Sequence, residues 1–227
     1  MPRGNFSPEL MDKLRAIDSP TISNAIETFN VRDRTEGFTG YDVRCLYPQL
    51  GTMVGYAVTA ICDNRPGEVA GRQAFYDWLE AIAEAPKPVV CVFQDVSPDP
   101  KTSCYMGEVM ATCAQKLGAI GLVTDGGVRD LDEVEALGFH YFAAGAVASH
   151  GNFAIVKVGL PVKISGVTIR PGDLIHGDRN GVLVIPDDAA EALPEAVETI
   201  RQREKRVLDF AKSKDFNVEK LIDVMSH

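Results

Sequence analysis

The chain has 227 residues, 45% hydrophobic and 24% charged, so it can bury a sizeable core and does not have the composition of a disordered protein. Its net charge of -9 argues against a surface for nucleic acid, and five cysteines without a C-x-x-C pair indicate a reducing compartment. No apolar run approaches the roughly 20 residues of a membrane-spanning helix, and no signal-like segment follows Met1. We therefore expect a cytoplasmic protein that binds neither nucleic acid nor membranes.

The N-terminal region, about residues 7–29, has the pattern of two helices. Ser7-Pro8-Glu9 supplies a cap, a first-turn proline and an early acid, and Ser19-Pro20 starts a second helix through Ile22 and Ile26. Residues 30–52 lack periodicity, which predicts an irregular connection. Strand structure should begin near Val54.

Strands and helices alternate in the middle of the chain. An amphipathic helix is predicted over 68–84, followed by a buried strand over 89–93. The remaining predicted elements are a helix over 108–117 stopped by Gly118, a strand over 120–124, a helix over 131–137 stopped by Gly138, and a strand over 141–144. This alternation is typical of a parallel sheet with right-handed crossovers.

From Phe153 the pattern changes to short β-runs separated by turn residues. The runs cover 154–158, 162–164, 167–169, 174–176 and 182–185, and we expect them to pair antiparallel. A helical tail follows over about 187–225, in which Pro194 should interrupt the first turns. No repeat or low-complexity linker is present, so we predict a single α/β domain over residues 1–227 with a mixed sheet.

The first candidate site follows the predicted strand over 120–124, where a turn with Gly126 and Gly127 precedes Arg129 and Asp130. Parallel sheets bind ligands at the carboxyl ends of their strands. Arg129 can grip a carboxylate or enolate oxygen, while Asp130 can bind Mg²⁺ or Mn²⁺. The alternative is that Asp130 and Glu133 merely cap a helix, which would explain the two acids and leave Arg129 unexplained.

The second candidate site is the predicted helix start at Gly107, Glu108, Val109 and Met110. The first N–H groups of a helix lack partners within it and can cradle an anion. Glu108 could act as a base or hold a water molecule bound to a metal. The alternative is that Glu108 only complements the helix dipole.

Other candidates have weaker support. His176 and Asp178 flank Gly177 just before the predicted hairpin turn of residues 178–181, so a ligand role for His176 competes with a purely local one. Asp95 follows a buried strand, where a turn role is favoured over a role in supporting the site. The histidines lack H-x-x-x-H spacing, and there is no G-x-S-x-G, P-loop or G-x-G-x-x-G motif, which argues against zinc enzymes, serine hydrolases and nucleotide enzymes.

These residues resemble a known family signature. The spacing of four residues resembles the acid-x20-R-D-x2-E/D pattern of the 4-hydroxy-4-methyl-2-oxoglutarate aldolase family, also called RraA-like proteins. In this chain the pattern is formed by Glu108, then after twenty residues by Arg129 and Asp130, and after two more by Glu133. The resemblance extends over about residues 15–190 and includes segments 19–25, 171–173 and 181–186. Glu108 is one methylene longer than the Asp that family enzymes often have.

The resemblance implies a three-layer swivelling-type β/β/α fold, assembled as a homotrimer or homohexamer with active sites at subunit interfaces. It also implies a class II pyruvate aldolase that needs a divalent metal, and a related oxaloacetate decarboxylase activity. Asp130 would bind the metal, and Arg129 would hold the pyruvyl group and its enolate. The N–H groups from Gly107 to Met110 would grip the carboxylate, while Glu108 and Glu133 would position water molecules of the metal, through which the C4 hydroxyl proton would leave.

Two alternatives remain at this point. One is a non-catalytic RraA-like regulator that binds ribonuclease E, which would need a protein-recognition surface and no metal. The acids Glu108, Asp130 and Glu133 count against this alternative. The other is a lyase for a different, sugar-derived 2-oxo acid, which differs only in the substrate pocket.

Overall fold

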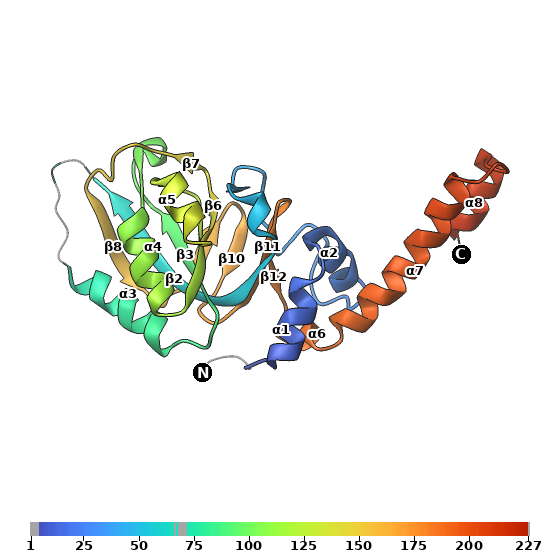
Figure 1. Cartoon of the computed structure of the whole chain (residues 1–227), viewed down its shortest axis with the longest axis horizontal. Coiled ribbons are helices and arrows are strands. Elements are labelled where there is room, and N and C mark those ends of the chain that lie inside the picture. Colours follow the sequence, from blue (N-terminus) through green and yellow to red (C-terminus); the bar gives the residue numbers. More distant parts are fainter. Residues whose placement is uncertain (1–4, 66, 68–71, 227) are drawn as a thin grey trace.

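Four parallel strands form the centre of the protein in the computed structural model, which describes residues 5–65, 67 and 72–226 (Figure 1). They lie in the order β6-β4-β3-β2. Their bounds are Met53–Asn64 for β2, Val89–Asp95 for β3, Ala119–Thr124 for β4 and His140–Ala143 for β6. The strands are almost continuously buried, as expected for parallel strands covered on both faces. The predicted parallel sheet is confirmed.

Antiparallel strands complete this sheet on both sides. Strand β1 (Arg44–Cys45) pairs with β6, while β11 (Leu174–Asp178) and β8 (Phe153–Val158) pair with successive halves of β2. Strand β12 (Gly181–Ile185) continues from β11 through the predicted hairpin turn. The antiparallel pairing expected after residue 153 is therefore confirmed.

Three helices cover one face of the sheet: α3 (Gln73–Glu84), α4 (Glu108–Lys116) and α5 (Leu131–Ala136). The buried residues of this layer include Trp78, Ile82, Ala111, Ala114 and Val134, packed on Cys91, Phe93 and Leu122 of the sheet. Gly118 and Gly138 follow α4 and α5 with φ of +100° and +69°, which confirms both predicted helix stops. Residues 68–71 of the predicted third helix lie outside the described residues, and α3 begins at Gln73.

The opposite face of the sheet is covered by the hairpin of β9 (Val162–Ile164) and β10 (Val167–Ile169). Its buried residues Val162, Ile164, Val167 and Ile169 pack in one cluster with Val90, Val92, Val123 and Phe142 of the sheet. Helices, sheet and hairpin thus form the three-layer β/β/α arrangement that was expected.

The terminal helices gather at the end of the sheet near β11 and β12 (Figure 1). Helices α1 (Pro8–Arg15) and α2 (Ser19–Glu27) begin with the capping side chains of Ser7 and Asp18. The C-terminal helices are α6 (Asp187–Ala190), α7 (Leu193–Ala211) and α8 (Val218–Ser226). The predicted interruption is the break between α6 and α7, and Pro194 lies just after it, in the first turn of α7. Figure 1 shows α7 and α8 projecting from the body as an arm. Among the described helices, none has the length and apolar content to cross a membrane.

Short elements complete the structure. They are the 3-10 helices η1 (Pro48–Leu50) and η2 (Pro100–Thr102), and the parallel strand pair β5 (Gly127–Val128) and β7 (Gly145–Ala146). The pair β5 and β7 was not predicted, because two-residue strands carry no periodic signal.

Candidate functional site

Backbone hydrogen bonds join the two predicted junctions. Gly127 N–H donates to Ser103 O at 3.0 Å, Tyr105 N–H donates to Gly127 O at 2.9 Å, and Arg129 N–H donates to Met106 O at 3.0 Å. These bonds align the segment that leads into α4 with the segment that leads into α5. The start of α4 therefore lies beside Arg129 and Asp130, although more than twenty residues separate them.

The Asp130 carboxylate binds the start of α4. Glu108 N–H donates to Asp130 Oδ2 at 2.9 Å, and Arg129 Nε lies 3.5 Å from the same oxygen. The absence of a side chain at Gly107 leaves room for this contact, since a Cβ at that position would collide with Asp130 Oδ2 and lie 2.9 Å from Arg129 Nε. The Asp130 side chain thus caps a helix from a distant part of the chain.

This geometry overturns the alternative that Asp130 caps its own helix. Asp130 precedes α5, but its side chain makes no capping hydrogen bond to that helix among the described residues. Its backbone is left-handed, with φ 57° and ψ 49°, a conformation that costs free energy in a residue other than glycine. That conformation turns the carboxylate toward α4.

A cavity of about 180 Å³ opens beside this contact. It is lined by Cys104, Tyr105, Met106, Gly107, Val109, Met110, Arg129, His150 and Phe153. This volume is below the roughly 300–1,000 Å³ of sites for drug-sized ligands, so the cavity suits a ligand of few atoms. Of the predicted substrate-binding residues, Gly107, Val109, Met110 and Arg129 meet here.

The predicted acids lie at or outside the rim of this cavity. The Asp130 side chain is 34% exposed and that of Arg129 is 36% exposed, so both can reach a ligand from solvent. Glu108 and Glu133 are exposed in the first turns of α4 and α5. Within the described ranges, no three His, Cys, Asp or Glu side chains gather closely enough to hold a metal ion. A cation at Asp130 would therefore depend on one carboxylate and on water.

A polar network fixes the wall behind the cavity. Tyr105 OH donates to Asp95 Oδ1 at 2.5 Å, and Ser97 N–H donates to the same oxygen at 2.7 Å. Asp95 therefore has the predicted turn role and also the role in supporting the site that was weighed against it. Asp95 N–H donates in turn to Asp125 Oδ1 at 2.7 Å. Burial raises the pKa of Asp125 to about 6, and the Asp95 carboxylate adds to the effect. Burial also raises the pKa of the Cys104 thiol in the cavity wall, which disfavours a thiolate nucleophile there.

No sequence pattern indicates that His150 and Phe153 belong to this cavity. Strands β5 and β7 run parallel, so the chain after Ala146 leaves this pair at the same end as the chain that continues to Arg129. Val147 N–H donates to Val128 O at 2.9 Å at that end. Phe153 then contacts the ring of Tyr105 edge-on, with centroids 5.7 Å apart. Only the long-range strand pairing brings these residues to the site.

His176 and Asp178 belong to the core. His176 Nε2 lies 3.0 Å from Ile17 O and 3.2 Å from Leu14 O, and its Nδ1 lies 3.0 Å from Ser19 Oγ. Because carbonyl oxygens only accept hydrogen bonds, Nε2 carries the proton and Nδ1 accepts from the serine hydroxyl. The side chain is fully buried, and the ligand role weighed for His176 is wrong.

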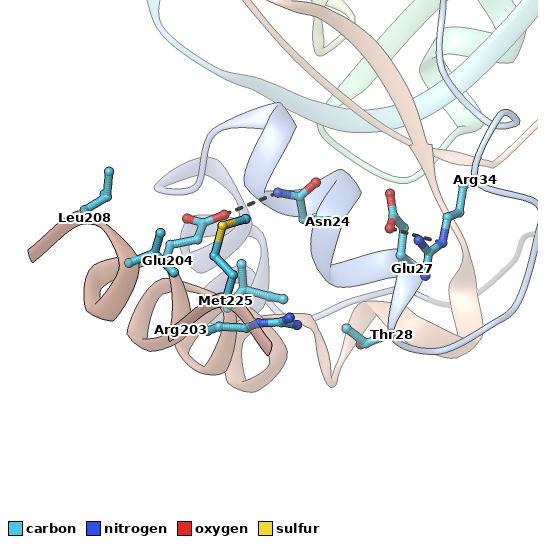
Figure 2. Close-up of a pocket in the computed structure, with 10 residues that line it drawn as sticks. Asn24, Glu27, Thr28, Arg34, Arg203, Glu204, Leu208 and Met225 are labelled. Carbon is cyan, nitrogen blue, oxygen red and sulfur yellow. Dashed lines mark hydrogen bonds and ion pairs between the residues drawn. The ribbon is translucent and has the colours of Figure 1, made fainter. Parts of the chain in front are cut away.

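A larger cavity, of about 560 Å³, lies between α2 and the C-terminal arm (Figure 2). Asn24 Nδ2 donates to Glu204 Oε1 across it at 3.4 Å, and Arg34 Nε lies 3.3 Å from Glu27 Oε2. Four of its polar side chains thus bind one another in pairs, and none of the predicted site residues lines it. We place the candidate site at the smaller cavity.

Comparisons with known proteins agree with this fold. The family model described as RraA-like: Aldolase/RraA matches residues 9–184. "Protein DlpA" of Legionella pneumophila is 31% identical over 203 residues, which cover 88% of this chain and 31% of DlpA. A Halalkalibacterium halodurans protein named "Putative 4-hydroxy-4-methyl-2-oxoglutarate aldolase" is 39% identical over 114 residues, covering 50% of this chain and 53% of that protein. The chain thus spans about half or less of these relatives.

A solved structure shares the architecture. The crystal structure of Streptomyces coelicolor RraAS2, an unusual member of the RNase ES inhibitor RraA protein family, superposes with a TM-score of 0.67. It is 22% identical, and the superposition covers 89% of this chain and 96% of that one.

Proposed function

Because the chain belongs to the Aldolase/RraA family, we propose that it is a divalent-metal-dependent carbon–carbon lyase acting on a 2-oxo acid. Its substrate is 4-hydroxy-4-methyl-2-oxoglutarate or a related 4-hydroxy-2-oxo acid, which it cleaves to pyruvate, and it also decarboxylates oxaloacetate. One observation carries the proposal: Arg129 and the start of α4 line one small cavity with the Asp130 carboxylate at its edge.

The reaction needs a group that absorbs negative charge. When the C3–C4 bond of the substrate breaks, its electron pair moves into the pyruvyl part as an enolate. Arg129 is a permanent cation in the cavity wall and holds the enolate oxygen. The N–H groups of Val109 and Met110, in the first turn of α4, bind the carboxylate, while Glu108 N–H is already occupied by Asp130.

The residues present fit a divalent cation of the Mg²⁺ or Mn²⁺ type. Such ions prefer oxygen ligands and keep several waters, and they are commonly held by one or two carboxylates. Asp130 offers a half-exposed carboxylate whose orientation is fixed by Glu108 N–H. We propose Asp130 as the direct ligand, with Glu108 and Glu133 positioning water. When bound, the cation supplies a Lewis acid for the same enolate oxygen.

A second candidate is the non-catalytic regulator that binds ribonuclease E. The similarity to RraAS2 favours it only at the level of the fold. A protein-binding surface would not need Gly107, which makes room for the Asp130 contact, or the half-exposed Arg129 beside it. A lyase for a sugar-derived 2-oxo acid would use the same groups with a different substrate.

We propose that the protein works in the cytoplasm as a homotrimer or homohexamer. The arm supports assembly, because large apolar side chains are 48–68% exposed on and between its helices. These residues are Leu208, Phe216, Val218, Ile222 and Met225. Light scattering after size-exclusion chromatography measures the mass directly, and a monomer at micromolar concentration would contradict this assembly.

A coupled lactate dehydrogenase assay tests the function. Oxaloacetate and 4-hydroxy-4-methyl-2-oxoglutarate are supplied with Mg²⁺ or Mn²⁺ and then with chelator, and pyruvate is expected only with metal. Arg129→Ala should lower kcat on the order of 10²-fold or more on both substrates, with a native-like circular dichroism spectrum. Arg170→Ala serves as the control arginine, since it lies outside the cavity. Normal turnover by Arg129→Ala, or no turnover by the wild type, would overturn the proposal.

A further inference from the structure

The cavity contains one side chain suited to proton transfer that nothing above uses. His150 lines it together with Arg129 and the start of α4. Its ring is exposed, so solvent and substrate can reach it. Retro-aldol cleavage requires removal of a proton from the C4 hydroxyl, and histidine is the side chain most often used for such a step.

Local hydrogen bonds hold His150 in place. Phe153 N–H donates to His150 O at 3.2 Å, which closes a turn, and Gly151 N–H donates to Ser149 Oγ at 3.2 Å. Asn152 N–H donates to Asn64 Oδ1 at 2.7 Å, which ties the turn to the end of β2. The histidine therefore sits on an anchored turn.

The ring also has a defined tautomer. His150 Nδ1 lies 2.7 Å from Gly151 O, and a carbonyl oxygen only accepts, so Nδ1 carries the proton. In the neutral ring, Nε2 is then the nitrogen with a free electron pair. That nitrogen can accept a hydroxyl proton, whereas the thiol of Cys104 and the phenol of Tyr105 in the same wall are held in their protonated forms by burial, which raises the pKa of each.

We propose that His150 is the general base of the cleavage reaction, a role that rests on the function proposed above. Nε2 takes the proton from the C4 hydroxyl, the C4–O bond becomes a carbonyl, and the C3–C4 bond breaks. The electron pair of that bond passes to the pyruvyl enolate held by Arg129. The enolate C3 then takes a proton from solvent, which completes pyruvate, and the imidazolium releases its proton to solvent and returns to its neutral form.

Oxaloacetate provides the internal comparison. Its C3–C4 bond breaks with release of carbon dioxide, and C4 carries no hydroxyl whose proton must be removed. A base for the hydroxyl is therefore needed for the aldol cleavage and is superfluous for the decarboxylation. Arg129 serves both reactions, so variants at the two residues should differ in which substrate they affect.

Two substitutions separate the role of the base from the role of the turn. His150→Asn keeps an amide N–H near the position of Nδ1 for Gly151 O and lacks Nε2. His150→Gln keeps a polar group near Nε2 that cannot accept a proton. Both should lower kcat for 4-hydroxy-4-methyl-2-oxoglutarate cleavage about 10²-fold. The kcat for oxaloacetate decarboxylation should change by less than about 3-fold, whereas the loss of a general base would lower it by about 10²-fold.

The controls are Lys157→Ala, an exposed residue of β8 outside the cavity, and Glu108→Gln, the rival base. Lys157→Ala should leave both reactions near wild type, and Glu108→Gln should not reproduce the selective loss. The KM for oxaloacetate and the thermal midpoint should remain unchanged in both histidine variants.

Several results would overturn the inference. Equal losses on both substrates, no loss on either, or a selective loss in Glu108→Gln alone would each exclude His150 as the base. A wild type that decarboxylates oxaloacetate and does not cleave the hydroxy acid would exclude it as well. A wild type that releases no pyruvate from either substrate would instead overturn the proposed function, and this role with it.

Discussion

Asp130 and Asp178 make the same kind of hydrogen bond in opposite surroundings. Each carboxylate accepts the backbone N–H at the start of a helix far away in the chain: Asp130 from Glu108 of α4 at 2.9 Å, and Asp178 from Ser19 of α2 at 2.8 Å. Asp178 is 7% exposed, and its other oxygen accepts Asn180 N–H at 2.7 Å. The Asp130 side chain is 34% exposed and lies beside Arg129.

The difference shows what separates a structural contact from a candidate site. A carboxylate surrounded by protein donors, as Asp178 is, stabilises the packing of one element on another. A carboxylate that keeps contact with water and with a cation retains binding capacity. This contrast can be tested by removing the charge of Asp130, by removing the buried hydrogen bonds of His176, and by adding a side chain at Gly107.

Asp130→Asn should produce the largest effect. Asn retains an oxygen that can accept Glu108 N–H and loses the negative charge, so the fold should persist while metal-dependent pyruvate release falls on the order of 10²-fold or more. The coupled assay measures the rate, and thermal unfolding measures the fold. Asp132→Asn, an exposed acid in the first turn of α5, is the matched control. Wild-type turnover by Asp130→Asn would show that this carboxylate, like Asp178, is structural only.

His176→Ala should affect stability and spare catalysis. The substitution removes the hydrogen bonds to Ile17 O, Leu14 O and Ser19 Oγ and leaves a cavity, which should cost about 2–4 kcal/mol of unfolding free energy. Denaturant titration measures the loss, while kcat per folded molecule should stay at the wild-type value. His150→Asn is the matched histidine control, with the opposite pattern expected.

The same residue predicts a pH dependence. Burial lowers the pKa of His176 from 6.5, so the unfolded chain binds a proton more readily than the folded protein does. Its contribution to stability is therefore present above about pH 6.5 and is lost as the pH falls toward the lower folded pKa. His140, whose pKa burial lowers to about 4, acts in the same direction. His176→Ala should make the unfolding free energy fall less steeply as the pH decreases below about 6.5. An unchanged pH dependence of the unfolding free energy would contradict a buried, neutral His176 ring.

Gly107→Ala should have the smallest of these effects. The added Cβ would displace the Asp130 carboxylate and the Arg129 guanidinium, so kcat/KM should fall between about 10- and 10²-fold, as expected when reacting groups are misplaced by about 1 Å. Unfolding free energy should change by less than about 1 kcal/mol, because half-exposed side chains can move aside. Gly145→Ala in β7 is the control, since its Cβ would meet nothing within 4 Å. Equal activity of the two alanine variants would contradict the assignment of the contact.

Local sequence signals were sufficient for most elements of the fold. Continuous β-branched runs predicted β3 and β4, the periodic apolar residues of 75–82 predicted α3, and the glycines at 118 and 138 marked helix ends that adopt positive φ. The strand pair β5 and β7 could not be found in this way, because each strand has two residues and its stability depends on a partner elsewhere in the chain.

The sequence by itself determined the alternation of strands and helices and the pairing of Arg129 with Asp130, since these depend on residue type and spacing along the chain. Only the tertiary structure decided which helix Asp130 caps, that a side chain at position 107 would displace Asp130 and Arg129, and that His150 shares the cavity of Arg129. Those outcomes depend on the register between residues 103–106 and 127–129 and between β5 and β7. Long-range hydrogen bonds set that register, and no short window of sequence contains both partners.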